Sequence, residues 1–175
     1  EAEEQTRRTL RAADVKAVAR EHGFPLAGIA AASPLADAER YGAWVDRGMA
    51  GAMGYLTDHR RDKRSDPATL LPGVRSILCV GLLYDYHQIL TEGLRSVEVH
   101  LREISSEPFD AKICVDTAPI LERSYARQAG LGWIGKNTCL IHEPTGSWYF
   151  LGELLLSLEL EPDTPAQDRC GSCRR

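Results

Sequence analysis

The sequence predicts an α/β domain in which helices flank a mixed β-sheet. Segments with strand character alternate with segments of helical periodicity along most of the chain. An uninterrupted apolar run at 76–83 is typical of a strand that is buried on both faces of a sheet. Hydrophobic residues make up 43% and charged residues 26% of the 175 residues, which is the composition of a globular domain with its own core.

The first part of the chain contains two expected helices and two expected strands. Apolar residues at helical spacing favour a first helix, which Gly23 ends. Ser33 and Pro34 form a helix start signal, with Ser33 as the N-cap and proline in the first turn. In chain order, the expected elements are a helix at 6–22, a strand at 26–32, a helix at 34–47, a loop at 48–54, a turn at 70–73 and a strand at 76–83.

The rest of the chain continues this alternation and ends in an expected hairpin. An apolar stripe at helical spacing predicts a long helix after the strand at 76–83. In chain order, the expected elements are a helix at 85–104, a strand at 109–116, a helix at 119–128, and strands at 137–141 and 147–160 joined by a turn at 143–146. We therefore assign residues 1–160 to one α/β domain and residues 161–175 to a linker that starts a further region.

Charge and cysteine usage narrow the function classes. The net charge of −4 argues against a dedicated nucleic-acid-binding domain, which is usually basic. The basic run at 59–64 is the local exception, and it also fits a solvated loop or helix end. No apolar segment is long enough for a membrane span, and the charged start lacks a signal-peptide core, so we expect a cytoplasmic protein. Cys79, Cys114 and Cys139 lie in apolar runs and are expected to be buried thiols.

Cys170 and Cys173 form the strongest local motif. Two thiolates at this spacing can bind zinc, ligate an iron–sulfur cluster or act as a redox pair. Two cysteines do not complete a tetrahedral metal site, however. A surface pair in a frayed tail is the alternative interpretation.

Two further segments carry candidate chemistry. Asp116 follows the strand at 109–116, where α/β sheets place catalytic groups, although Asp116 or Thr117 could instead cap the next helix. Glycines around Trp133, in the segment 130–138, let the backbone approach a large ligand, although an ordinary turn explains them as well. His142 could ligate a metal or hydrogen-bond within a turn.

These segments, in this order and ending on the cysteine pair, resemble the epoxyqueuosine reductases. That family consists of cobalamin-dependent iron–sulfur enzymes that complete queuosine in tRNA. The resemblance covers essentially the whole chain. It includes additional short motifs at 51–56, 64–67, 71–76, 85–87, 150–153 and 161–163.

The resemblance implies a reaction and a set of site residues. The family reduces epoxyqueuosine at the wobble base of a tRNA anticodon, with cobalamin and two [4Fe-4S] clusters carrying electrons. It implies that Asp116 protonates the epoxide oxygen, with an elevated pKa favoured by Ile113, Val115 and Ile120. The implied cobalamin site consists of Arg64, Asp116, Gly135, Lys136, Asn137, Leu140, His142 and Leu151. Cys170 and Cys173 would be the first two cluster ligands, at the start of a ferredoxin-like region.

The implied partners are the anticodon stem-loop of a tRNA and an electron donor of unknown identity, with no membrane and a monomeric state. Tyr84 runs directly into Asp85 where the family has a loop, and the remaining cluster cysteines are missing. We therefore expect the chain by itself to be inactive. The alternatives are a related corrinoid iron–sulfur reductase of a small molecule, a non-enzymatic cobalamin- or tRNA-binding module, and a zinc scaffold.

Overall fold

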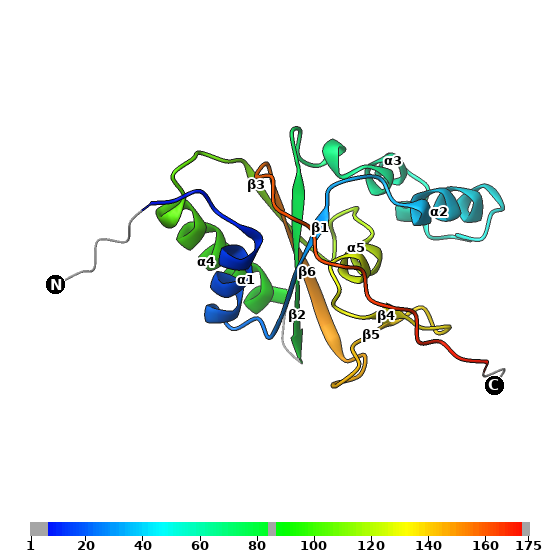
Figure 1. The fold of residues 1–175 in the computed structure, drawn as a ribbon. Helices are drawn as coiled ribbons and strands as arrows, with labels where there is room; N and C mark the ends of the chain where they lie inside the picture. Colours follow the sequence, from blue (N-terminus) through cyan, green and yellow to red (C-terminus); the bar gives the residue numbers. More distant parts are fainter. Residues whose placement is uncertain (1–6, 84–86, 173–175) are drawn as a thin grey trace.

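A four-stranded antiparallel sheet forms the centre of the molecule (Figure 1). The structure, a computed structural model, describes residues 7–83 and 87–172. The strand order is β1-β2-β6-β3. The strands are β1 (Leu26–Ala31), β2 (Ser76–Leu83), β6 (Tyr149–Leu156) and β3 (Ala111–Val115). The predicted α/β fold class is confirmed, but these strands pair antiparallel throughout instead of forming a mixed sheet.

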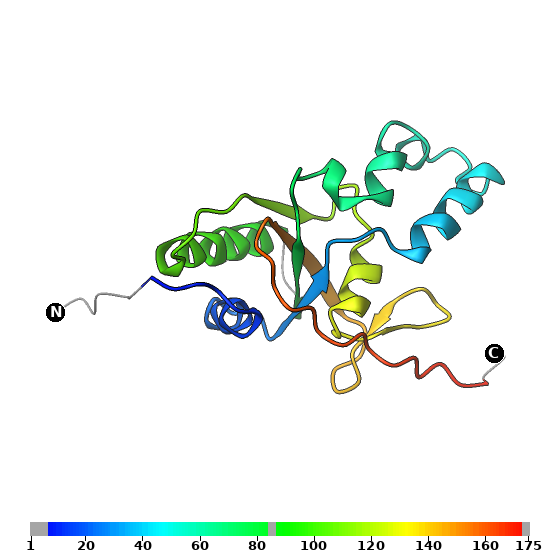
Figure 2. The ribbon, with the colours of Figure 1, turned by 45° about the horizontal axis from the view of Figure 1, so that its top comes forward.

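Helices cover the two faces of the sheet unequally (Figures 1 and 2). Helices α1 (Ala12–Glu21) and α4 (His87–Ile104) pack side by side on one face. Helix α5 (Glu122–Gln128) packs on the other face, against β1, β2 and β6. Its approach to β1 is very close, since a Cβ at Gly28 would lie 2.0 Å from the carbonyl oxygen of Ala129. Only glycine fits at that position.

Each face has its own hydrophobic core. The core under α1 and α4 is built from large aliphatic and aromatic side chains, including Phe24, Leu78, Leu94 and Leu154. The core under α5 contains smaller groups, including Ala126 and the two buried cysteines of β2 and β3. Successive residues of β6 contribute to opposite cores, because side chains alternate along a strand.

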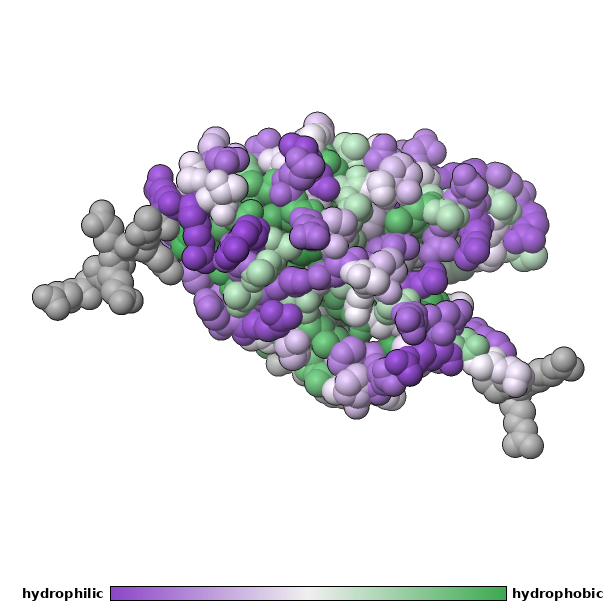
Figure 3. Space-filling model, viewed as in Figure 1, coloured by the Kyte–Doolittle hydropathy of each residue, from purple (hydrophilic) through white to green (hydrophobic). Residues whose placement is uncertain are grey.

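A helical excursion connects β1 to β2. It contains α2 (Ala36–Asp46), the short 3₁₀ helix η1 (Gly54–Leu56), α3 (Arg60–Ser65) and a second 3₁₀ helix η2 (Pro67–Thr69). The basic run at 59–64 is therefore largely helical. Figure 3 shows hydrophilic side chains gathered over this lobe, which a notch separates from the C-terminal segment.

The predicted hairpin between 137–141 and 147–160 is wrong. β5 (Leu140–Ile141) pairs with β4 (Trp133–Ile134), whereas β6 pairs with β2 and β3 in the main sheet. The turn between β5 and β6 contains only an isolated bridge between His142 and Gly146. The small β4–β5 hairpin lies below α5 in Figure 1.

The segment 161–169 runs across the edge of the sheet as a strap. Asp163 accepts a hydrogen bond from the Ile29 amide at 2.8 Å and forms an ion pair with Lys16 of α1. The amide of Ala166 donates to the carbonyl of Arg127 in α5 at 3.0 Å. The strap is therefore attached to elements on both faces of the sheet.

Most expected elements appear with shorter bounds. The first helix begins at Ala12, and α5 begins at Glu122, three residues after the expected Pro119. The expected helix from residue 85 and the junction of Tyr84 with Asp85 fall partly or wholly outside the described residues. Among the described residues, no helix combines the length and the apolar character needed to span a bilayer.

Candidate functional site

Asp116 occupies a strained turn at the end of β3. Its φ is +48°, in the left-handed region that few residues other than glycine, asparagine and aspartate adopt readily. The amide of Thr117 donates to the carbonyl of Val115 at 2.6 Å, which closes the turn. The N-cap of α5 is Leu121, so Asp116 and Thr117 do not cap that helix. The turn instead presents Asp116, which is exposed, at the end of the sheet.

Asp116 opens onto a pocket of about 140 Å³. The lining residues come from α4, β3, α5 and β6: Leu90, Val115, Asp116, Glu122, Tyr149, Phe150 and Leu151. The structure thus brings together Asp116 and Leu151, two of the residues expected in one site. Ile120 is buried and Ile113 and Val115 are half-buried, but these side chains do not enclose the exposed Asp116.

His142 is connected to this pocket through Tyr149. The Tyr149 hydroxyl lies 3.3 Å from His142 Nδ1, and the two rings meet edge to face. The Thr145 hydroxyl lies 2.8 Å from the same nitrogen. His142 is thus hydrogen-bonded within its turn, which is the alternative to metal ligation that the sequence analysis left open. It also contacts Tyr149, a tyrosine of the pocket wall.

The loop between β4 and β5 is braced from within. The amide of Gly135 donates to the Cys139 carbonyl at 2.9 Å, and the Asn137 side-chain oxygen accepts from the Cys139 amide at 3.1 Å. Arg123 of α5 donates to the Thr138 carbonyl, and no sequence pattern pointed to this arginine. Asn137 therefore shapes the loop, and Leu140 is buried in the core under α5.

Cys170 lies close to the same loop. Lys136 Nζ donates to the Gly171 carbonyl at 3.0 Å, and Arg169 forms an ion pair with Glu143 at 2.9 Å. Cys170 is half-buried and not in a disulfide, whereas Cys173 lies outside the described residues. Within the described ranges, no three His, Cys, Asp or Glu side chains are grouped as a metal site.

Arg64 lies apart from the Asp116 pocket. It is on α3 and donates to the carbonyls of Tyr55 and Arg60 at 3.2 and 3.3 Å. Its guanidinium also lies over the ring of Tyr41, 5.8 Å from the centroid. The described structure therefore does not bring Arg64 together with Asp116 and Leu151.

Glu153 is a candidate that sequence reasoning missed. It is fully buried on β6, and neither carboxyl oxygen has a hydrogen-bond partner among the described residues. Burial raises the pKa of the Glu153 carboxyl well above its usual range, and the charge of Glu122 raises it further. The available signal was a glutamate inside an apolar strand, in phase with Leu151 and Leu155.

Two cysteines flank Glu153 in the sheet register. Cys79 of β2 and Cys114 of β3 are its direct cross-strand neighbours. Burial raises the pKa of the Cys114 thiol to about 12 and moves the pKa of Cys79 well above its usual value. Both residues are thus neutral thiols of the core, as their apolar sequence context predicts.

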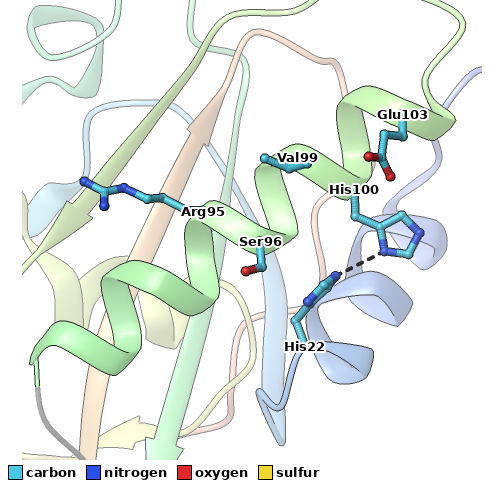
Figure 4. A pocket seen from close by; sticks show the side chains of 6 residues that line it. All are labelled: His22, Arg95, Ser96, Val99, His100 and Glu103. Atoms are coloured by element: carbon cyan, nitrogen blue, oxygen red, sulfur yellow. Dashed lines mark hydrogen bonds between the residues drawn. The ribbon is translucent and has the colours of Figure 1, made fainter.

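A separate cavity of about 480 Å³ lies beside α1 and α4 (Figure 4). His22 Nε2 and His100 Nδ1 lie 3.2 Å apart at its edge. This cavity shares no lining residue with the Asp116 pocket.

Comparison with known proteins identifies the origin of this arrangement. No family model matches the chain. An epoxyqueuosine reductase from Xanthomonas campestris is 38% identical, over 94% of this chain and 53% of that protein. One from Gloeobacter violaceus is 41% identical, over 94% of this chain and 57% of that protein. The chain is a homologue of the N-terminal part of the epoxyqueuosine reductases. It spans about half the length of these curated relatives.

Solved structures agree with this assignment. An epoxyqueuosine reductase from Streptococcus thermophilus has a TM-score of 0.83 at 26% identity, over 93% of this chain and 50% of that one. An epoxyqueuosine reductase crystallised with an epoxyqueuosine-modified tRNA stem loop has a TM-score of 0.79 at 26% identity, over 92% and 49%. The reductive dehalogenase NpRdhA shares the fold alone, with a TM-score of 0.62 at 14% identity, over 90% of this chain and 20% of that one.

Proposed function

We propose that this chain is the proton-donating, cobalamin-binding part of an enzyme that reduces epoxyqueuosine to queuosine in tRNA. The observation that carries the proposal is Asp116, held in a left-handed turn at the mouth of the pocket that Leu151 lines. Strained residues persist where the surrounding structure enforces them, and they concentrate at functional sites. The curated relatives named epoxyqueuosine reductase support the choice of reaction.

Asp116 is the proton donor in this proposal. Opening the C–O bond of an epoxide leaves an alkoxide oxygen that needs a proton. A carboxylic acid at an open pocket can reach that oxygen, whereas an acid in the core could not. The backbone conformation of the turn sets the direction in which the Asp116 side chain leaves the chain.

The surface next to Asp116 fits a corrin. Phe150, which lines the Asp116 pocket, is 45% exposed, and Trp148, two residues before it, is 73% exposed, although both are large apolar residues. Apolar side chains exposed together mark a binding surface. Because the pocket itself holds only about 140 Å³, a macrocycle would lie across this surface. When bound, cobalamin supplies the low-potential electrons that side chains do not provide.

The remaining site residues are proposed to frame the cofactor. His142 would act through Tyr149, and Gly135, Lys136, Asn137 and Leu140 would set the shape of the neighbouring loop. Arg64 would have to approach from the α2–α3 lobe. We keep residues 1–160 as the cobalamin domain and 161–175 as the start of the cluster region. Cys170 alone does not make a cluster site, which needs four ligands, and no metal-binding group is present among the described residues.

The α2–α3 lobe is the proposed contact for tRNA phosphates. Arg60 and Arg61 are in ion pairs with Asp58 and Asp46, each at 2.7 Å, which lowers the net positive charge of the run. Lys63 and Arg64 follow on the same helix. The relative solved with a tRNA stem loop supports tRNA as the partner.

We propose that the enzyme acts as a monomer in the reducing cytoplasm, where free thiols persist.

The first test is a cobalamin titration of this chain, followed by its visible spectrum. We expect a shift to the base-off form for the wild type and for Asp116→Asn, and loss of the shift for Phe150→Asp. Glu159→Gln, on the exposed end of the chain's last apolar segment, is the matched control. Identical spectra for free cobalamin and for cobalamin with the wild-type chain would count against a corrin site on these residues.

The second test measures reduction in the enzyme that contains this chain and the remaining half of its relatives' length. Asp116→Asn keeps a side chain that tolerates a positive φ but cannot donate an acidic proton. We expect a loss of about 100-fold or more in the rate of epoxide reduction, with tRNA binding retained. Wild-type rates in this variant would remove Asp116 from the acid role. Absence of salt-dependent tRNA affinity would favour a small-molecule reductase instead.

A further inference from the structure

A fully buried carboxyl group without a hydrogen-bond partner is costly to retain. The free-energy cost of burying an isolated ionised carboxylate in an apolar interior is far larger than the effect of a typical point mutation. A folded protein therefore keeps such a group protonated and neutral. Glu153 is 0% exposed, and both of its carboxyl oxygens lack partners in the described structure. The neighbouring buried positions of β6 are leucines, and a leucine at position 153 would satisfy the same apolar packing. Packing of the core therefore does not explain a glutamate at this position.

Glu153 lies directly behind the Asp116 pocket. It is opposite Cys114 in the β3–β6 register, and the turn that holds Asp116 begins directly after β3. Leu151, two residues before Glu153, lines the pocket. Glu122 of α5 lines the same pocket as Asp116 and is the acid whose charge acts on Glu153.

Among the ionisable groups around Glu153, Glu122 is the one whose charge acts on it. Cys79 from β2 and Cys114 from β3 are buried thiols whose pKa values are raised far beyond neutrality. Tyr125 of α5 is also buried, and its hydroxyl donates to the Ser33 carbonyl at 2.9 Å. A negative charge on Glu122 therefore disfavours a second negative charge on the buried Glu153 and adds to the effect of burial on the pKa of Glu153.

We propose that Glu153 and Glu122 form a carboxyl pair that stores one proton behind the Asp116 pocket and returns it to Asp116 during turnover. The proposal rests on the proposed function of Asp116. When the protonated Asp116 gives its proton to the epoxide oxygen, it is left as a carboxylate. The stored proton then moves from the Glu122 carboxyl to Asp116, and the pair takes a replacement proton from water. Atoms and charge balance, and no electron passes through the pair.

The proposal predicts a protonated buried acid that infrared spectroscopy detects without any reaction. At neutral pH, the wild-type chain should show the carbonyl stretch of a protonated carboxylic acid. In the Asp116→Asn background, which removes the other proposed protonated acid, Glu153→Gln should lose this band, whereas the exposed control Glu159→Gln should retain it. Its absence from the wild type or from Asp116→Asn would overturn the proposal. The Asp116→Asn chain alone decides this, so the test survives even if a Glu153 variant fails to fold.

The proposal also predicts a change in the pH profile of the full enzyme. In Glu153→Gln and in Glu122→Gln, we expect the rate of reduction to fall roughly tenfold or more above neutral pH, with KM unchanged and partial rescue by Glu153→Asp. A purely structural role would change the rate equally at every pH. If Asp116→Asn abolishes reduction while Glu153→Gln keeps the wild-type pH profile, the carboxyl pair is refuted and the role of Asp116 stands. If Asp116→Asn is fully active, the proposed function itself fails.

Discussion

The two faces of the central sheet are built from different chemistry. Under α1 and α4, the core consists of large hydrocarbon side chains such as Phe24, Leu94 and Leu101. Under α5, the buried layer contains two thiols, a tyrosine hydroxyl and the carboxyl group of Glu153. The first face provides stability through apolar burial. The second face gives up part of that stability to place polar groups behind an open pocket.

The strand β6 makes this division possible. Leu154 and Leu156 point into the core under α4, while Leu151, Glu153 and Leu155 point toward α5. One sequence segment thus serves both faces, because its side chains alternate. Substitutions on the two faces should therefore have opposite consequences.

The largest expected effect is on the α4 face. Leu94→Ala removes a fully buried side chain that packs over Gly152 of β6. We expect the free energy of unfolding to fall by about 2–5 kcal/mol. The substitution loses the burial of the leucine side chain and leaves a cavity in the core. Urea denaturation measures this loss. Val99→Ala, at an exposed position of the same helix, should change stability by less than about 0.5 kcal/mol. Equal losses at the two positions would contradict the description of this face.

On the α5 face, removal of a buried group should stabilise the chain. Glu153→Leu replaces the unpartnered carboxyl by a side chain of similar volume, and we expect a gain of about 1–4 kcal/mol at neutral pH. Because the pKa of Glu153 is raised in the folded state, the wild type binds a proton that the unfolded chain has released. Its stability therefore falls as pH rises above the ordinary carboxyl pKa.

The advantage of Glu153→Leu should accordingly grow from mildly acidic to mildly alkaline pH, as measured by urea denaturation at each pH. A gap that is constant with pH would mean that Glu153 is not protonated in the folded chain.

The contacts of the strap at 161–169 should stabilise elements on both faces of the sheet. Asp163→Ala removes the acceptor of the Ile29 amide and the ion pair with Lys16. We expect a loss of about 1–3 kcal/mol, since a hydrogen bond to a charged group is broken. Trypsin should also cleave after Arg169 faster than in the wild type. Glu161→Gln, at an exposed position of the same segment, is the control and should leave the cleavage rate unchanged.

The smallest expected effect is at the Asp116 turn. A φ of +48° favours glycine over alanine, so Asp116→Gly should be more stable than Asp116→Ala by about 1–2 kcal/mol. Asp110 precedes the same strand without a positive φ, and there alanine should be at least as stable as glycine. Thermal melts of the four variants give the comparison. The same ranking at both positions would show that the turn stores no strain.

The sequence was most informative where one local pattern dominates. β2 has the expected bounds, and α4 ends where its apolar stripe ends, because burial on one or both faces imposes a clear periodicity. The prediction of Asp116 as a site residue used a local signal, a strand end followed by an acid. The pocket around it required the spatial proximity of α4, α5 and β6, which no local pattern encodes.

The errors have the same physical origin. The hairpin prediction for β5 and β6 used a plausible turn, but β6 gains more from the buried centre of the sheet between β2 and β3. Arg123 was missed because its role depends on the position of Thr138 in another element. Glu153 was visible only as an interruption in an apolar run, and its chemistry follows from complete burial.

The strap has one further consequence, which concerns self-association. β1 is an edge strand of the sheet, and an exposed edge offers unpaired amides and carbonyls to a second copy. Asp163 occupies both groups of Ile29, since its amide donates to the Ile29 carbonyl at 2.8 Å while its carboxylate accepts from the Ile29 amide. A single aspartate thus occupies the backbone groups in the middle of the edge, where a strand of a second molecule would otherwise pair.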